Sequence, residues 1–273
     1  MKTSLLALVV LLIQIGSAVA GEEPLDVLFI GNSYTYGNDL PGIIEAMAAA
    51  GGGRKIAAER SVHGGFTLQK HFEKGEGVEK IRSKRWDVVV LQEQSQMPCV
   101  NPKLMHQFAR KLHAEIAKQH AETVFFLTWA RQHIPEMQQG LNDGYFKIAK
   151  ELDAKVAPVG VAWKNALAAD GKLVLHRADK SHPNSAGSYL AACVFYATLL
   201  ESSPVGLPAE LEKGGKLLVK LDAKLAGQLQ KIAQKTVEDL PPGRVPDNRS
   251  DIGGQPPGSG SETCGQFCSE DLP

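Results

Sequence analysis

Three residues of this chain have side chains that can together carry out nucleophilic catalysis. Ser33 directly follows Gly31-Asn32 at the end of an apolar run, and Asp179 precedes His182 by three residues. A serine hydroxyl is a weak nucleophile at neutral pH and needs a base within hydrogen-bond reach. A histidine has the near-neutral pKa that this base requires. A nearby carboxylate fixes the histidine tautomer and stabilises the imidazolium. The sequence therefore predicts a triad of Ser33, His182 and Asp179.

An oxyanion that develops on a substrate needs fixed hydrogen-bond donors. The candidate donors are the backbone N–H groups of Ser33 and Gly65 and the side-chain amide of Gln92 or Gln94. Both glutamines point to the same side if their strand continues, so the residues leave this choice open. Glu93 lies between them. Because a carboxylate would oppose the oxyanion, we expect Glu93 to point away into a hydrogen-bond network.

Each of these features has a simpler explanation when it is taken singly. A serine after a strand is usually a helix cap, and a Gly-Gly pair is usually a turn. An Asp-x-x-His sequence before a helix is more often a cap followed by a surface histidine. Their joint occurrence, in this order and each after a predicted strand, favours the catalytic interpretation.

Short apolar runs alternate with helical segments along the chain. The predicted strands are residues 27–30, 55–58, 88–91, 124–127 and 155–159. The predicted helices are residues 40–50, 66–73 with 78–83, 102–120, 135–152, 163–169, 185–200 and 215–239. This alternation predicts an α/β fold, a doubly wound, flavodoxin-like three-layer α/β/α sandwich with a five-stranded parallel sheet. Ligands bind such sheets at the carboxyl ends of the strands, where the candidate residues lie.

The two ends of the chain differ from the middle. Residues 1–20 combine a basic start, the apolar run Leu5–Ile15 and a small-residue cleavage site, which indicates a signal peptide. The apolar run is shorter than the roughly 20 residues that span a bilayer. We expect an exported protein, periplasmic or extracellular, that is not inserted in the membrane after cleavage. Residues 21–240 form one domain, and the Pro/Gly/Ser-rich residues 241–273 are predicted to be disordered.

Charge and cysteine content exclude other classes of protein. Lys and Arg together number 30, as do Asp and Glu, so no nucleic-acid partner is predicted. Cys193 lies in an apolar helical run and is expected to pack in the core. Cys264 and Cys268 can pair with each other in an oxidising compartment, although the sequence does not establish the bond.

Other polar and aromatic residues are weaker candidates. His106, His113 and His120 recur every seven residues on one predicted helix, about 10 Å apart along its axis. That distance excludes a shared metal and favours a solvated face, and neither a metal nor an organic cofactor is predicted.

Candidate substrate contacts follow the strands. Trp129 and Arg131 follow the fourth strand, although Trp129 fits the edge of the core equally well. His63 flanks the Gly-Gly turn, where a plain loop residue is the alternative. Tyr34 is expected to shape the mouth of the pocket.

Residues 25–200 resemble the SGNH (GDSL-type) hydrolases, which are esterases and lipases on this sandwich fold. Gly31-Asn32-Ser33 is similar to the first family block, where a Gly-Asp precedes the nucleophilic serine. Gly65 matches the second block, and Asp179 to His182 matches the last block. The third block is usually Gly-x-Asn-Asp, but this chain has Gln92-Glu93-Gln94-Ser95. Glutamine carries the same amide donor on a longer arm.

The resemblance implies a serine esterase that works through an acyl-serine intermediate without a cofactor. Export and the glutamine-type third block favour a small acyl group, such as acetyl, on a carbohydrate. A lipid esterase or lipase of the same fold is one alternative. A non-catalytic carbohydrate-binding protein on this scaffold is the other.

Overall fold

A computed structural model describes residues 22–241 of the chain. The central sheet is formed by five parallel strands in the order β2-β1-β3-β4-β5. They are β1 (Leu25–Gly31), β2 (Ile56–Val62), β3 (Val88–Leu91), β4 (Glu122–Phe126) and β5 (Lys155–Ala157). This is the flavodoxin-like order, and the predicted five-stranded parallel sheet is confirmed. The predicted signal peptide, the tail and the Cys264–Cys268 pair lie outside the described residues.

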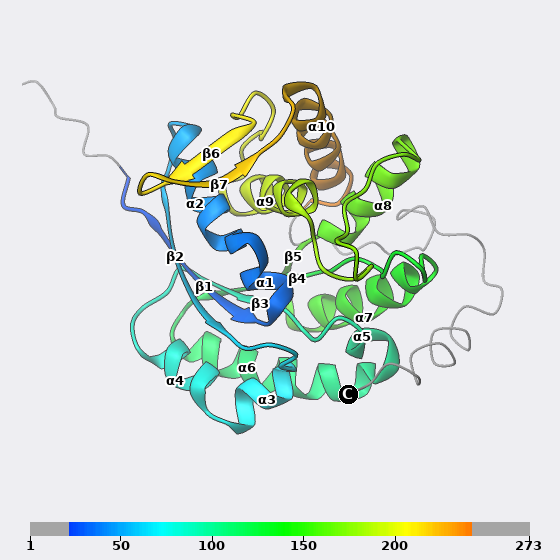
Figure 1. The fold of residues 1–273 in the computed structure, drawn as a ribbon. Helices are drawn as coiled ribbons and strands as arrows, with labels where there is room; N and C mark the ends of the chain where they lie inside the picture. The colour runs from blue at the N-terminus through cyan, green and yellow to red at the C-terminus, as the bar shows by residue number, and fades with distance from the viewer. Residues whose placement is uncertain (1–21, 242–273) are drawn as a thin grey trace, which may run out of the picture.

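Helices cover both faces of the sheet (Figure 1). One face is covered by α2 (Leu40–Ala50), α8 (Val159–Ala169), α9 (Ser185–Leu200) and α10 (Ala223–Asp239). The other face is covered by α3 (Leu68–Glu73), α4 (Glu76–Arg82), α6 (Pro102–Lys118) and α7 (Met137–Leu152). Shorter turns of helix are α1 (Ser33–Tyr36), η1 (Gly37–Asp39) and α5 (Met97–Val100). No helix within residues 22–241 is long and apolar enough to cross a membrane.

Strand β1 shows why its residues form a buried strand. Val27 and Phe29 pack into the core on the α9 side, whereas Leu28 and Ile30 pack into the core on the α6 side. Side chains alternate between the two faces of a strand, so a strand that is covered on both faces is apolar throughout. The strand therefore ends where the polar residues begin, and it delivers Ser33 to the carboxyl end of the sheet.

The predicted helix over residues 215–239 is wrong in its first part. A two-stranded antiparallel hairpin, β6 (Glu210–Lys213) and β7 (Lys216–Lys220), precedes α10. Gly214 and Gly215 form its turn with φ angles of 58° and 75°. Glycine adopts such positive φ angles without the steric cost that other residues meet, and a Gly-Gly pair is a typical two-residue hairpin turn.

The expected solvated face of histidines on α6 is also wrong in part. His106 is only 6% exposed, and its Nε2 lies 2.8 Å from the Gly144 carbonyl oxygen of α7. Burial is the main reason why the pKa of His106 is lowered. His113 is half-buried, with its Nδ1 2.9 Å from Thr123 Oγ1. His120 lies two residues beyond the end of α6 and is the exposed member of the three.

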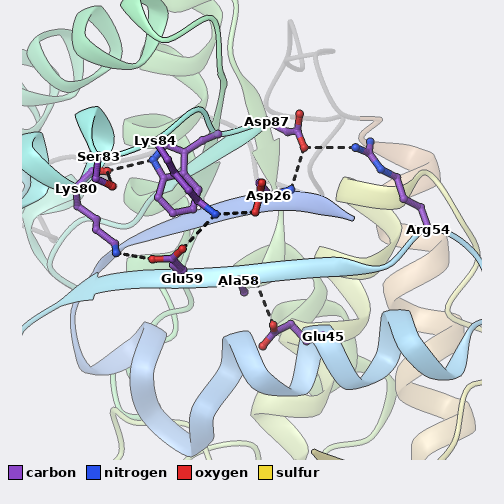
Figure 2. Close-up of polar contacts among 10 residues, drawn as sticks. Asp26, Glu45, Arg54, Ala58, Glu59, Lys80, Ser83, Lys84 and Asp87 are labelled. Carbon is purple, nitrogen blue, oxygen red and sulfur yellow. Dashed lines mark hydrogen bonds and ion pairs between the residues drawn. The ribbon is translucent and has the colours of Figure 1, made fainter. Parts of the chain in front are cut away.

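An ion-pair network braces the sheet near the amino-terminal ends of its strands (Figure 2). Lys84 Nζ lies 2.8 Å from Asp26 Oδ1 of β1 and 3.1 Å from Glu59 Oε1 of β2. Asp87, just before β3, accepts a hydrogen bond from the Asp26 N–H and pairs with Arg54. All these side chains are more than a third exposed, so each pair contributes at most about 1 kcal/mol.

Candidate active site

The turn of residues Gly31, Asn32 and Ser33, named the nucleophile turn for its candidate nucleophile Ser33, joins β1 to α1. Asn32 caps α1, because its Oδ1 accepts a hydrogen bond from the Tyr34 N–H at 3.1 Å. Ser33 is the first residue of the helix, where backbone N–H groups have no partner within the helix. Gly31 allows a close approach: a Cβ at this position would lie 2.5 Å from Gln92 Oε1 and 2.6 Å from Thr35 Oγ1. The turn is therefore packed tightly beneath the serine.

The three residues of the predicted triad lie in one hydrogen-bonded chain. His182 Nε2 is 2.8 Å from Ser33 Oγ, and His182 Nδ1 is 2.8 Å from Asp179 Oδ2. The other carboxylate oxygen, Asp179 Oδ1, accepts hydrogen bonds from the N–H groups of Ser181 and His182, each at 2.9 Å. This is the geometry in which a histidine takes a proton from a serine while a carboxylate holds the ring.

The charge state of Asp179 follows from these contacts. Desolvation is the largest single influence and raises the pKa of Asp179. The hydrogen bonds from the Ser181 and His182 N–H groups and from the imidazole together outweigh it, and the pKa falls to about 2. Asp179 is therefore ionised at neutral pH, as a residue that stabilises an imidazolium must be.

Aromatic side chains hold the loop that carries His182. The Tyr34 hydroxyl lies 2.6 Å from Ser181 Oγ, and Trp129 Nε1–H donates to the Ser181 carbonyl oxygen at 3.0 Å. The Tyr34 ring stacks on Trp129 at 4.6 Å and meets the His182 ring edge-on at 5.4 Å. Trp129 in turn stacks on Trp163 at 4.1 Å.

Burial changes the roles predicted for two of these residues. Tyr34 is 3% exposed and Trp129 is 1% exposed, so both side chains are almost completely buried beside the His182 loop. Both side chains therefore support the His182 loop, and their substrate contacts stay predictions.

The remaining predicted substrate contacts lie at two places. Arg131 Nη2 donates to Gln96 Oε1 at 3.0 Å, and His63 pairs with Glu76 and packs 4.5 Å from the Phe66 ring. A cavity of about 280 Å³ lies between the loop after β4 and α8. It is lined by Arg131, Trp129, Trp163, Leu167 and His176, among others. The substrate contacts of Arg131 and His63 stay predictions.

The two glutamines of the third block have different surroundings. Gln92 is fully buried, and its Oε1 accepts hydrogen bonds from the Asn32 N–H and the Thr35 hydroxyl, each at 2.9 Å. Its Nε2 donates to the Glu93 carbonyl oxygen. The oxygen and the nitrogen of this side-chain amide thus both form hydrogen bonds beneath the nucleophile turn. The predicted oxyanion role of Gln92 is wrong.

Gln94 remains as the side-chain candidate for the oxyanion hole. Its Oε1 accepts hydrogen bonds from the N–H groups of Gln96 at 2.8 Å and Met97 at 3.2 Å. These contacts fix the side-chain amide. Within residues 22–241, Gln94 Nε2 donates no hydrogen bond, so it is available to a substrate. Gly65 lies in the turn after β2 with a φ of 67°. The oxyanion roles of Gln94, Gly65 and the Ser33 N–H stay predictions.

Comparison with known proteins gives matches in structure only. No protein-family model matches the sequence, and no curated protein is similar enough in sequence to match. A DUF4886 family protein from Bacteroides uniformis ATCC 8492 has a TM-score of 0.64 and 17% identity, over 79% of this chain and 95% of that chain. A proposed SGNH hydrolase from Slackia heliotrinireducens has a TM-score of 0.57 and 23% identity, over 65% of this chain and 100% of that chain.

A third match is a catalytic mutant of Axe2, an acetylxylan esterase from Geobacillus stearothermophilus. Its TM-score is 0.53 and its identity 16%, over 63% of this chain and 93% of that chain. This chain has the SGNH hydrolase fold. At these sequence identities the likeness establishes the fold alone.

The sequence did not show the supporting role of several residues of this SGNH-fold site. Gln92, Asn32 and Thr35 form a buried cluster beneath Ser33, and Tyr34 with Trp129 holds the His182 loop. Asn32 and Thr35 flank the serine, but their partners are dozens of residues away. The one usable signal was the excess of polar residues directly after buried strands.

The two glutamines give a prediction that separates catalysis from stability. Replacing Gln94 by Ala should lower kcat for an acetyl ester by roughly 100-fold, because one fixed oxyanion donor is lost. Replacing Gln92 by Ala should instead lower the free energy of unfolding by about 1–3 kcal/mol, because the Asn32 N–H and the Thr35 hydroxyl lose a buried acceptor. Steady-state kinetics and thermal melting of both variants check this. Full kcat in Gln94→Ala would contradict the oxyanion role.

Proposed function

We propose that the protein is a secreted serine esterase that removes a small acyl group, most simply acetyl, from a carbohydrate. The observation that carries this proposal is the hydrogen-bonded chain from Ser33 Oγ through His182 to Asp179, at 2.8 Å for each link to the imidazole. Export is inferred from the signal-like residues 1–20.

The proposed reaction has two steps. Ser33 Oγ attacks the ester carbonyl carbon while His182 Nε2 takes the hydroxyl proton. The oxyanion is stabilised by the N–H groups of Ser33 and Gly65 and by the Gln94 amide. His182 then gives the proton to the leaving alcohol, and Ser33 carries the acyl group. In the second step His182 Nε2 takes a proton from a water molecule as the water oxygen attacks the acyl carbon. His182 then gives this proton to Ser33 Oγ as the bond between Ser33 and the acyl group breaks, which releases the carboxylic acid and restores the free serine.

The surroundings of the triad support a substrate whose bulk stays in solvent. The His182 side chain is 35% exposed and the Asp179 side chain is 48% exposed, so the triad lies at an open surface. A long acyl chain needs a deep apolar channel, whereas an acetyl group on a polysaccharide does not. An acetylxylan esterase among the similar folds is consistent with this choice.

Comparing esters of different acyl length tests the proposal. We expect the secreted protein to hydrolyse p-nitrophenyl acetate faster than p-nitrophenyl dodecanoate, and to release acetate from acetylated xylan. A preference for the long chain would favour a lipid esterase of the same fold. Retention on polysaccharide without hydrolysis of any ester would favour a carbohydrate-binding protein.

A further inference from the structure

Glu93 is a buried carboxyl group between the two loops that carry the candidate oxyanion donors. It is 1% exposed, and its Oε1 accepts hydrogen bonds from the Leu68 N–H at 3.2 Å and the Gln94 N–H at 2.6 Å. Leu68 begins α3 just after the Gly65 turn. We propose that Glu93 is a positioning residue that fixes Gly65 and Gln94 relative to Ser33. This inference rests on the proposed esterase function.

The Gly65 turn is closed by a hydrogen bond from the Phe66 N–H to the His63 carbonyl oxygen at 3.2 Å, and two side chains anchor it to the rest of the site. Asn32 Nδ2 donates to the Phe66 carbonyl oxygen at 3.0 Å, and Glu93 holds the Leu68 N–H two residues further on. Gly65 itself is exposed, and no atom lies within 4 Å of the position of an added Cβ. Packing therefore does not set the direction of its N–H group. The hydrogen bond within the turn and the two anchors at Phe66 and Leu68 set this direction.

The backbone of Glu93 is held as firmly as its side chain. Its N–H donates to the Tyr145 hydroxyl of α7 at 3.0 Å, and its carbonyl oxygen accepts from Gln92 Nε2. Gln92 Oε1 in turn accepts from the Asn32 N–H, next to the nucleophile. The nucleophile turn, the Gly65 turn and the loop after β3 are thus linked in one closed network through Glu93.

The electrostatics of Glu93 suit a position near a developing oxyanion. Burial is the largest influence and raises the pKa of Glu93 to about 8, although the hydrogen bonds from Gln94 and Leu68 lower it in part. At neutral pH the group is therefore mostly an uncharged acid. An uncharged carboxyl keeps an acceptor oxygen for both N–H groups without placing a negative charge beside the oxyanion. Glutamine has the same shape and the same acceptor.

Two substitutions test the role of Glu93. Glu93→Gln keeps the acceptor oxygen and should keep kcat within about threefold of the wild type. Glu93→Ala removes it and should lower kcat about 10- to 100-fold with KM little changed, because the donors move from their places. Glu115→Ala is the matched control: Glu115 is an 8% exposed carboxylate of α6 that pairs with Arg82 and Lys118. It should keep kcat.

Hydrogen exchange provides a second readout that does not depend on activity. In Glu93→Ala the hydrogen-bonded amides of Phe66, Leu68 and Gln94 should exchange faster than in the wild type, and they should not do so in Glu93→Gln or Glu115→Ala. Unchanged exchange together with unchanged kcat in Glu93→Ala would overturn the proposal. A lower kcat/KM that comes from a raised KM alone, with kcat unchanged, would also overturn the proposal.

Other outcomes are also decisive. If wild-type protein hydrolyses no ester, the proposed function fails, and the exchange data still decide whether Glu93 positions these loops. If Glu93→Ala does not fold, the kcat of Glu93→Gln tests whether the acceptor oxygen is sufficient. A loss of kcat in Glu93→Gln by 10-fold or more, in a protein that melts like the wild type, would contradict a role that needs only the acceptor oxygen.

Discussion

Replacing Ser33 by alanine is expected to remove ester hydrolysis, with a loss in kcat of roughly 10,000-fold or more. The reason is that the Ser33 hydroxyl, 2.8 Å from His182 Nε2, supplies the atom that forms the acyl-enzyme. The side chain is small and half-buried, so thermal melting should hardly change. Steady-state hydrolysis of p-nitrophenyl acetate by the two proteins measures the effect.

The matched control for this variant is Ser185→Ala. Ser185 is an exposed serine at the start of α9, close in sequence to the triad histidine but without a triad contact. Its replacement should leave kcat unchanged. Activity that survives in Ser33→Ala would show that another residue attacks the ester.

Replacing Asp179 by asparagine should give the second largest loss, about 10,000-fold in kcat. Asparagine can still accept the N–H bonds of Ser181 and His182, so the loop should keep its shape. It carries no charge to stabilise the imidazolium, and its amide disfavours the tautomer in which His182 Nδ1–H faces residue 179. Steady-state kinetics, together with thermal melting to confirm the fold, measures this loss.

Asp170→Asn is the control for that change. Asp170 is an exposed aspartate that accepts the Lys172 N–H at 2.9 Å, a local turn contact like that of Asp179 but without a histidine. It should keep the wild-type kcat. Equal activity of Asp179→Asn and Asp170→Asn would mean that Asp179 only shapes its loop.

The lowered pKa of Asp179 also has a consequence for stability. The pKa is about 2 in the folded protein and 3.8 for an ordinary aspartate, so the unfolded chain binds this proton more tightly. The carboxylate therefore stabilises the fold above about pH 4, and this contribution is lost as the pH falls through about 2. Because the side chain is 48% exposed, solvent weakens the effect.

The sequence was sufficient to predict the sheet and the proximity of Ser33, His182 and Asp179, because both follow from local patterns. The buried strands are continuous apolar runs, and parallel strands bring their carboxyl ends to one edge. Ser33 directly follows β1, and the Asp179–His182 pair lies in the loop between α8 and α9 that follows β5, so their meeting across 149 residues is a consequence of topology.

For the rest of the site, similar side chains compete for the same role, and three-dimensional packing determines which of them takes it. Gln92 and Gln94 are chemically identical and two residues apart. The oxygen and the nitrogen of the Gln92 amide both form hydrogen bonds beneath the nucleophile turn, whereas only the oxygen of the Gln94 amide is hydrogen-bonded. Tyr34 and Trp129 are buried by each other's rings. The hairpin at Gly214–Gly215 was missed because its leucines continue the helical spacing of α10, although the glycine pair was a readable turn signal.

Covalent labelling tests the central claim, that Ser33 is a nucleophile activated by His182, most directly. The protein would be treated with a phosphonate ester that has a p-nitrophenyl leaving group, and the adduct mapped by peptide mass spectrometry. The expected result is one adduct on Ser33, absent in Ser33→Ala and formed much more slowly in His182→Ala. Ester hydrolysis that continues without an adduct on Ser33, or with the adduct on another residue, would contradict the proposed mechanism.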